Sequence, residues 1–435
     1  MPEKVLRNEF IFEINDLAVF KEKILAQSKV YEDFIFLESN SQLNSESAYD
    51  FIAAFASKKK YQGNDFQGLQ KFLDTEKDYA FGNFCYNLKD DIWGLSSLKN
   101  QQIPFSKISF FIPSIIVFSK NNKITVSLSN EMSRNKFFSI LNSKIAGDKK
   151  DEVLHQNINT ISWEEYQIKF NKVKKHIQRG DIYEVNLCNE FYGKINIEPL
   201  KIFKKLNSIS SAPYATLYRQ ENSWLICSSP ELYLRKKAST VTTKPIKGTA
   251  PRNSNLAIDE HNKTMLLVSE KERNENVMIV DLARNDLSTI AEKKSVVVTK
   301  MFDVETFKQV HQLVSTIECL VSKNINVVDI VKNTFPMASM TGVPKKRAME
   351  IIEDTESFNR GLYSGSVGFF EPCGDFSFNV VIRSILYNKE TSEFSFAVGS
   401  AITDKCNAID EYNECLLKAK AMVEVLGFES KNNFG

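Results

Sequence analysis

Two carboxylates and an amine share one face of a predicted helix near the end of the chain. Glu411, Glu414 and Lys418 have the spacing i, i+3 and i+7. The same face continues through Leu417, Ala421 and Val425, which are expected to pack inward. The two carboxylates are therefore expected to face the core. A solvated helix edge, or a simple ion pair between Glu414 and Lys418, explains the same spacing.

A second predicted helix repeats this conflict between an apolar face and a charged side chain. Glu275 lies on one stripe with Met278, Ile279 and Leu282 within residues 270–286. Carboxylates presented inward by two helices suit a hard cation, because Mg²⁺ takes one or two carboxylates, keeps water ligands and bridges to an anionic ligand. These residues motivate a Mg²⁺ site.

A lysine followed directly by glycine ends an alternating, strand-like segment. In residues 245–249 (PIKGT), Gly248 lets a ligand approach the backbone next to Lys247. A surface lysine at a strand end is the ordinary explanation, since lysine is seldom buried. The chain has no phosphate-binding glycine loop, no dinucleotide fingerprint and no serine-hydrolase elbow. Nucleotide and serine-hydrolase chemistry therefore have no support.

Length and composition describe the protein that must position these groups. The chain has 435 residues, 43% hydrophobic and 25% charged, which is typical of a globular protein of two or three domains or one large lobed domain. Its formal net charge of +2 gives no footprint for nucleic acid. Seven scattered cysteines without a C-x-x-C pair indicate a reducing compartment and no disulfide framework.

Targeting and membrane signals are missing from the sequence. Residues 1–10 carry charge but no apolar run, so we expect no secretory signal and a cytoplasmic protein. The longest uncharged apolar stretch, residues 108–119, is interrupted by Pro113 and is shorter than the roughly 18 residues of a membrane span. We interpret it as a strand, and expect no membrane association.

The elements divide at a charged, turn-prone segment, residues 147–152 (GDKKDE). We place a domain boundary there, between an N-terminal lobe (1–150) and a catalytic domain (155–430). The second part opens with a helix that Ser162 and Glu165 cap and that Arg179 and Gly180 end. Its apolar face is formed by Tyr166, Phe170, Val173 and Ile177.

Strand-like and helical runs alternate after this helix. Short β-prone runs at 214–218, 225–228, 232–235 and 241–246 predict an antiparallel meander. Helical runs follow at 256–284, 343–354 and 409–426, and strand-like runs at 295–301, 362–370, 376–387 and 393–402. The class is α+β, with large antiparallel sheets.

Several ordered blocks resemble the chorismate-utilising enzymes, a family that includes anthranilate synthase component I, aminodeoxychorismate synthase component I, and the isochorismate and salicylate synthases. The blocks are 180–186 (GDIYEVN), 229–231 (SPE), 244–252 (KPIKGTAPR), 275–286 (ENVMIVDLARND), 310–316 (VHQLVST), 341–352 (TGVPKKRAMEII), 360–368, 379–384 (NVVIRS) and 411–420. The resemblance implies two large antiparallel β-sheets packed face to face with helices outside. It also implies an active site in a cleft between the two halves.

Two positions separate the branches of this family. In what the resemblance implies, lysine before Gly248 marks the aminodeoxychorismate synthase branch, whereas anthranilate synthases usually have alanine where this chain has Lys247. Isochorismate and salicylate synthases have a water-activating lysine at the position of Glu184. The resemblance therefore favours amination of chorismate at C4, and anthranilate synthase component I is the alternative. Residues 37–39 partly match the tryptophan feedback block of that alternative.

The resemblance also assigns catalytic roles. Glu231 is the expected general acid for the departing C4 hydroxyl, and neutral Lys247 is expected to add covalently to C2 before ammonia enters at C4. An amine of ordinary pKa about 10.4 is mostly charged at neutral pH, so we expect burial or a neighbouring cation to lower the pKa of Lys247. His311 is expected near C2 as an orienting group, and a core histidine with satisfied hydrogen bonds is an equal alternative.

Substrate and metal ligands follow in the same way. Arg383 and Tyr363 are expected to bind the enolpyruvyl carboxylate, with Gly248, Thr249 and Gly399 in the pocket and Lys418 near its metal end. Mg²⁺ on Glu275 and Glu414, with Glu411 close by, would hold the ring carboxylate. The chain departs from the family pattern at Met337-Ala338 and at residues 398–401.

The source of ammonia lies outside this sequence. None of the seven cysteines lies in a G-x-C-x-G glutaminase motif. A separate glutamine amidotransferase subunit is therefore the partner that the resemblance implies. The product would serve para-aminobenzoate and folate synthesis.

Overall fold

The structure is a computed structural model that describes residues 7–40, 49–143, 158–308 and 310–428. The predicted domain boundary at 147–152 lies outside the described residues. Strands from both sides of that boundary share one sheet. Strand β2 (Asp33–Glu38) pairs with β8 (Tyr214–Gln220), and β4 (Ala80–Phe84) pairs with β16 (Ser366–Phe370).

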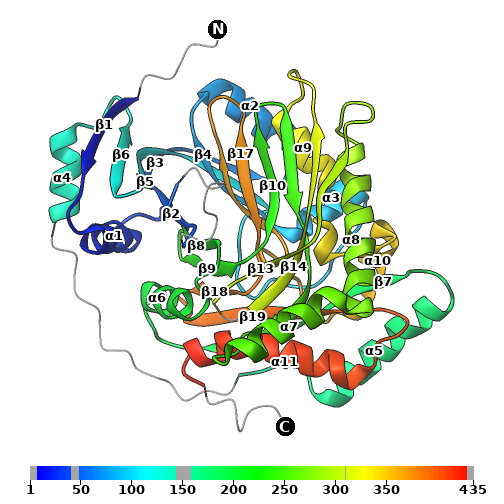
Figure 1. The fold of residues 1–435 in the computed structure, drawn as a ribbon. Helices are drawn as coiled ribbons and strands as arrows, with labels where there is room; N and C mark the ends of the chain where they lie inside the picture. The colour runs from blue at the N-terminus through cyan, green and yellow to red at the C-terminus, as the bar shows by residue number, and fades with distance from the viewer. Residues whose placement is uncertain (1–6, 41–48, 144–157, 309, 429–435) are drawn as a thin grey trace.

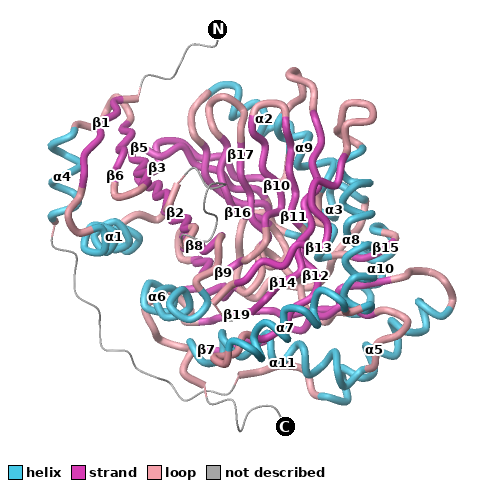
Figure 2. The backbone as a smooth tube through the Cα atoms, viewed as in Figure 1, coloured by secondary structure: helices cyan, strands magenta, loops and turns pink. Residues whose placement is uncertain are grey.

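The predicted α+β class with large antiparallel sheets is confirmed. Within the described residues, nineteen strands form one hydrogen-bonded network in which neighbouring strands pair antiparallel. Figure 2 shows these strands in magenta. The network is folded into two halves, which correspond to the two predicted sheets. Strands β3 (Phe51–Gly63) and β5 (Ile108–Lys120) join them, because β3 pairs with β2 in one half and β5 pairs with β4 in the other.

The remaining strands fall into these two halves by their pairings. The first half adds β1 (Asn8–Glu13), β6 (Lys123–Leu128), β7 (Glu184–Lys194), β9 (Ser223–Ser229), β15 (Gly342–Val343), β18 (Ser384–Asn388) and β19 (Glu393–Ile402). The second half adds β10 (Leu232–Lys237), β11 (Thr240–Lys244), β12 (Ile246–Pro251), β13 (Val297–Thr306), β14 (Val310–Leu320) and β17 (Phe376–Val380).

Apolar side chains from the two halves meet in one core cluster. Ile35 and Leu225 come from the first half, and Phe81 and Phe369 from the second. Phe81 and Phe369 stack with their ring centroids 5.4 Å apart. Burial of each such side chain contributes about 1.5–3 kcal/mol to folding. This cluster therefore fixes the two halves face to face.

Helices cover the outer faces of the two halves (Figure 1). Helices α1 (Leu17–Ala26), α4 (Arg134–Asn142), α6 (Pro199–Ser210) and α11 (Ala408–Val425) pack on the first half. Helices α2 (Phe66–Glu76), α8 (Glu270–Ser288) and α9 (Val327–Thr334) pack on the second. The other helices are α3 (Lys89–Trp93), α5 (Trp163–Gln178), α7 (Leu256–Val268) and α10 (Lys345–Thr355). No helix among the described residues is long and apolar enough to cross a membrane.

The helix predicted after residue 160 is confirmed as α5. Ser162 and Glu165 form a reciprocal capping box, which satisfies backbone N–H groups at the start of the helix. All four residues of the predicted apolar face are buried. They pack with α10 and with strands β7 and β19, and so support the strand on which Glu184 lies.

The predicted meander is wrong at one connection. Strand β9 pairs with β8 and β18, whereas β10 pairs with β11 and β17, so β9 and β10 are not neighbours. The chain crosses from the first half to the second at residues 229–231, where Pro230 has no N–H to continue the ladder. Strands β11 and β12 are also not paired with each other, because both pair with β14.

Two predicted elements are each divided in the structure. The helical run 256–284 is two helices, α7 and α8, because Ser269 ends the first and its side chain caps the second by accepting a hydrogen bond from Glu272. The run 376–387 is two strands, β17 and β18. Between them Arg383 has φ +49°, a left-handed conformation that is uncommon for a residue other than glycine.

Candidate active site

A buried ion pair joins the two halves of the sheet. Lys247 Nζ on β12 lies 2.8 Å from Glu184 Oε1, at the start of β7. The side chains are 11% and 1% exposed. Because β7 and β12 belong to different halves, this contact marks the place where the halves meet around the predicted nucleophile.

The electrostatic environment of Lys247 differs from the expected one. Burial lowers the pKa of the Lys247 ammonium, but Glu184 and Glu275 raise it more, so the pKa lies above its ordinary value. The expectation of a lowered pKa is therefore wrong for the residues described here, because carboxylates rather than cations surround the amine. A proton acceptor is needed before Lys247 can act as a nucleophile.

Glu231 has the environment that a general acid needs. It lies at the crossing between the two halves and is 4% exposed. Burial raises the pKa of its carboxyl to about 7, against the opposing effects of Ser339 and the nearby cation of Lys247. A carboxyl with that pKa holds its proton in a large fraction of molecules at neutral pH.

Met337 and Ala338 lie beside this carboxyl. They line a hollow of about 20 Å³ together with Glu231 and Ser339. Such a hollow holds about one water molecule. The departure from the family pattern at residues 337–338 therefore falls next to the expected general acid.

Arg383 is a partly buried cation whose side chain has no ion pair in the part of the chain that the structure describes. Burial lowers the pKa of its guanidinium to about 10, and the Glu231 carboxylate opposes that effect. An unpaired, partly buried guanidinium is suited to a carboxylate ligand. The hydroxyl of Tyr363 instead lies 3.7 Å from the sulfur of Cys188.

Helices α8 and α11 meet through their charged residues. Lys271 Nζ lies 3.1 Å from Glu411 Oε1 and 3.9 Å from Glu275 Oε1. Glu414 lies 2.6 Å from Lys418, which lowers the pKa of the Glu414 carboxyl although burial acts in the opposite direction. Burial raises the pKa of Glu275 to about 7.

The inward face of α11 agrees with the prediction only in part. Glu411 is 1% exposed, as expected, but Leu417 is 69% exposed and lies on the solvent side. The buried stripe runs instead through Cys415, Ala419 and Met422. These residues follow Glu411 at helical spacing and so share its face of the helix, whereas Leu417 lies on a different face.

Two of the three small residues predicted in the pocket, Gly399 and Gly248, lie next to charged residues of α11 and α8. Gly399 accepts a hydrogen bond on its carbonyl from Lys418 at 2.8 Å and pairs with Cys188 of β7. Gly248 has φ +92°, and a Cβ there would lie 2.9 Å from the carboxylate of Glu272. The left-handed φ favours glycine at 248, and a larger residue would also displace the end of the Glu272 side chain. Thr249 pairs with Gln312 of β14.

His311 has partners for both ring nitrogens. Its Nδ1 lies 2.9 Å from the hydroxyl of Thr306, and its Nε2 lies 3.1 Å from Asp259. Arg252 donates two hydrogen bonds to the same Asp259, at 2.9 and 3.0 Å. Both ring nitrogens are therefore satisfied, as in a core histidine, and the orienting role of His311 near C2 stays a prediction.

The carboxylates offer the donor chemistry of a Mg²⁺ site without a preassembled cage. Among the described residues, no group of three or more His, Cys, Asp or Glu side chains is arranged to hold a metal. Glu275 Oε1 is nevertheless buried without a hydrogen-bond partner. Mg²⁺ needs only one or two protein carboxylates besides water and substrate oxygens, so Glu275 and Glu414 fit this ion.

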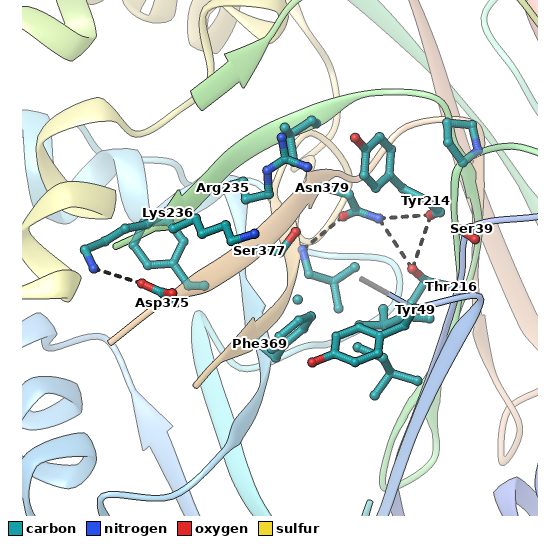
Figure 3. A pocket seen from close by; sticks show the side chains of 18 of the residues that line it. Ser39, Tyr49, Tyr214, Thr216, Arg235, Lys236, Phe369, Asp375, Ser377 and Asn379 are labelled. Carbon is teal, nitrogen blue, oxygen red and sulfur yellow. Dashed lines mark hydrogen bonds and ion pairs between the residues drawn. The ribbon is translucent and has the colours of Figure 1, made fainter. Parts of the chain in front are cut away.

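A large cavity lies elsewhere (Figure 3). It has a volume of about 640 Å³ and is lined by residues of both halves, including Tyr49, Tyr214 and Phe369. Asn379 donates to the Tyr214 carbonyl at 3.2 Å at its wall. Residues 37–39, which partly match a tryptophan feedback block, line this cavity, and none of the predicted catalytic or metal residues does.

Sequence reasoning missed two partners in the site. Glu184 was considered only as the position where a base lysine is missing, although it forms the ion pair with Lys247. Lys271 lies one helical turn before Glu275 and contacts two of the predicted metal ligands. Its i,i+4 spacing from Glu275 was the available signal.

Comparison with known proteins gives consistent matches. A family model described as chorismate binding enzyme matches residues 21–424. The chain is 31% identical over 348 residues to aminodeoxychorismate synthase component 1 of Escherichia coli (strain K12), covering 80% of this chain and 76% of that protein. It is 42% identical over 255 residues to a probable aminodeoxychorismate synthase, chloroplastic, of Oryza sativa subsp. japonica, covering 58% of this chain.

Coverage of the relatives and structural similarity complete the comparison. The chain spans 28% of the length of the rice protein. The fold is similar to that of MenF, the menaquinone-specific isochorismate synthase from Escherichia coli, with a TM-score of 0.79 at 17% identity. That match covers 97% of this chain and 94% of MenF, and supports the predicted architecture.

Proposed function

The chain belongs to the chorismate-binding enzyme family, and we propose that it is component I of an aminodeoxychorismate synthase. The proposed reaction replaces the C4 hydroxyl of chorismate by an amino group and gives 4-amino-4-deoxychorismate for para-aminobenzoate and folate synthesis. A separate glutamine amidotransferase subunit supplies the ammonia; the E. coli relative is likewise named a component. The proposed compartment is the cytoplasm.

The observation that carries this proposal is the buried amine of Lys247. A lysine at this position distinguishes amination at C4 from the other reactions that the resemblance offers. Its amine is 2.8 Å from Glu184, and its charge interacts with that of Glu231, which is the expected acid. A nucleophile and an acid therefore share one buried site.

These two residues divide the chemistry in the proposed mechanism. The Lys247 nitrogen adds to C2 while the two conjugated ring double bonds shift toward C4 and the C4–O bond breaks. Glu231 donates the proton that lets the hydroxyl leave as water. Ammonia then adds at C4, both ring double bonds shift back, and the bond between C2 and the lysine nitrogen breaks.

Substrate binding relies on cationic groups. Arg383 would donate hydrogen bonds to the enolpyruvyl carboxylate, because its partly buried guanidinium has no ion pair among the described residues. Glu275, Glu414 and Glu411 would hold Mg²⁺, which when bound supplies charge neutralisation at the ring carboxylate. Lys418, with its contacts to Glu414 and Gly399, holds the metal end of the site in place.

Anthranilate synthase component I is the second candidate, because residues 37–39 line the large cavity between the halves. Product analysis distinguishes the two functions. The purified chain is incubated with chorismate, Mg²⁺ and ammonium salts, and the products are separated by chromatography. We expect aminodeoxychorismate and no pyruvate, whereas anthranilate with stoichiometric pyruvate would overturn the proposed function.

A further inference from the structure

We propose that Glu184 is the base that accepts the proton of Lys247, so that the lysine nitrogen can attack chorismate. This inference rests on the proposed amination and adds a residue to its machinery. The acceptor Oε1 lies 2.8 Å from Nζ, within the range of about 2.6–3.2 Å that proton transfer requires. Glu184 therefore contacts the reacting atom itself.

The backbone around Glu184 is held firmly. Glu184 pairs with Val343 of β15, and the next residue, Val185, pairs with Ile402 of β19. A Cβ at Gly342 would lie 2.2 Å from the Glu184 carbonyl oxygen, so β15 and β7 are in close contact. The carboxylate is thus presented from a strand that is fixed on both sides.

A second observation separates this ion pair from a structural one. Glu184 Oε2 is buried and has no hydrogen-bond partner among the described residues. Glu356 also forms a buried ion pair, but both of its carboxylate oxygens accept hydrogen bonds. Arg360 donates to each oxygen, and the Cys188 N–H donates to Oε1 as well. Structural buried ion pairs satisfy their remaining lone pairs. Glu184 retains an acceptor that the fold does not use.

The surrounding charges make a local acceptor necessary. Lys247 is influenced by Glu275 of α8 and Glu414 of α11 as well as by Glu184 of β7, and all three keep it protonated. Glu272 and Lys271 of α8 act in turn on Glu275. Transfer within the pair converts two buried charges into two neutral groups, which a site of low dielectric constant favours over release of a bare charge.

The proton balance closes over one turnover. The proton moves from Nζ to Oε1, and the nitrogen lone pair forms the bond to C2 while Glu231 protonates the departing C4 oxygen. When ammonia adds at C4, the lysine nitrogen leaves as a neutral amine and regains its proton from Glu184. The proton released by the new ammonium group at C4 returns to Glu231.

The test is Glu184→Gln, which keeps the side-chain shape and a hydrogen-bond acceptor but removes the base. With chorismate, Mg²⁺ and ammonium, we expect kcat to fall by about 10²–10⁴, the range for general base catalysis, with a threefold or smaller change in the KM for chorismate. The rate of the variant should rise with pH, because solvent must now remove the lysine proton. Glu184→Asp, which keeps a base, should recover at least about tenfold over Glu184→Gln.

Glu190→Gln is the matched control. Glu190 lies on the same strand and its carboxylate accepts from Ser395 at 2.6 Å, away from Lys247. It should retain full activity. A kcat of wild-type size for Glu184→Gln would overturn the inference. It would also be overturned if Glu184→Gln and Glu184→Asp lost the same amount of activity and that loss matched a fall in their melting temperatures. An inactive wild-type chain would instead overturn the proposed function.

Discussion

Lys271 of α8 contacts Glu411 of α11 at 3.1 Å, and this contact connects the two helices that carry the predicted Mg²⁺ ligands. The ammonium also lies 3.9 Å from Glu275. The positive charge of Lys271 thus partly neutralises two of the three predicted metal-binding carboxylates. A metal ion bound there would supply part of the positive charge that Lys271 now supplies.

Removing a metal-binding carboxylate should abolish activity without unfolding the protein. We expect Glu275→Gln and Glu414→Gln to lose activity at ordinary Mg²⁺, because each removes a charged oxygen ligand, while the melting temperature stays close to wild type. Glu411→Gln should be milder, since Glu411 lies at the edge of the proposed site. Mg²⁺ titrations of the rate provide the measurement. Near-normal activity and Mg²⁺ dependence in either of the first two variants would refute the metal assignment.

Glu231 should set the alkaline limb of the pH profile. Its pKa is raised to about 7, so the carboxyl carries its proton below that pH and loses it above. We expect kcat with saturating ammonia to fall as pH rises through about 7, and Glu231→Gln to lower kcat by about 10²–10⁴. The profile is measured from pH 5.5 to about 9 at constant free ammonia. If the residual activity of Glu231→Gln still fell as the pH rose through the same range, that fall would come from another group and the assignment of Glu231 would be wrong.

His311 should act on stability rather than on turnover. His311→Gln breaks the buried contacts to Thr306 and Asp259, so the free energy of unfolding should fall by about 1–3 kcal/mol. We expect kcat of the folded variant to stay within about fivefold of wild type, less than the loss of an acid or base causes. Chemical denaturation and steady-state kinetics on the same preparation measure both. A large loss of kcat with unchanged stability would restore the orienting role.

Local signals in the sequence were sufficient for many elements of the fold. The capping box and apolar spacing of α5 predicted its start and its buried face, because both depend on neighbouring residues. The crossing between β9 and β10 was not predictable in this way. It depends on which distant strands, β17 and β18, lie beside them. Spacing also could not place Leu417, since the packing of the whole helix decides which arc is buried.

The candidate site shows the same limit. Residue types and the family resemblance predicted Lys247 and Glu231 as site residues, but the charge state of Lys247 depends on carboxylates from three other elements. The expected lowering of its pKa failed for that reason. Likewise, the hydrogen bonds of His311 come from residues far apart in the chain, on α7 and β13. Tertiary electrostatics therefore had to come from the structure.

The most direct measurement is mass spectrometry of the chain incubated with chorismate and Mg²⁺ in the absence of ammonia. If Lys247 is the nucleophile, the peptide that contains it should gain the mass of chorismate less one water, and addition of ammonium should discharge the adduct as aminodeoxychorismate. Lys247→Ala should form no adduct and should lose amination while it still binds chorismate. A Lys247→Ala enzyme that makes aminodeoxychorismate at a comparable rate would contradict the covalent mechanism.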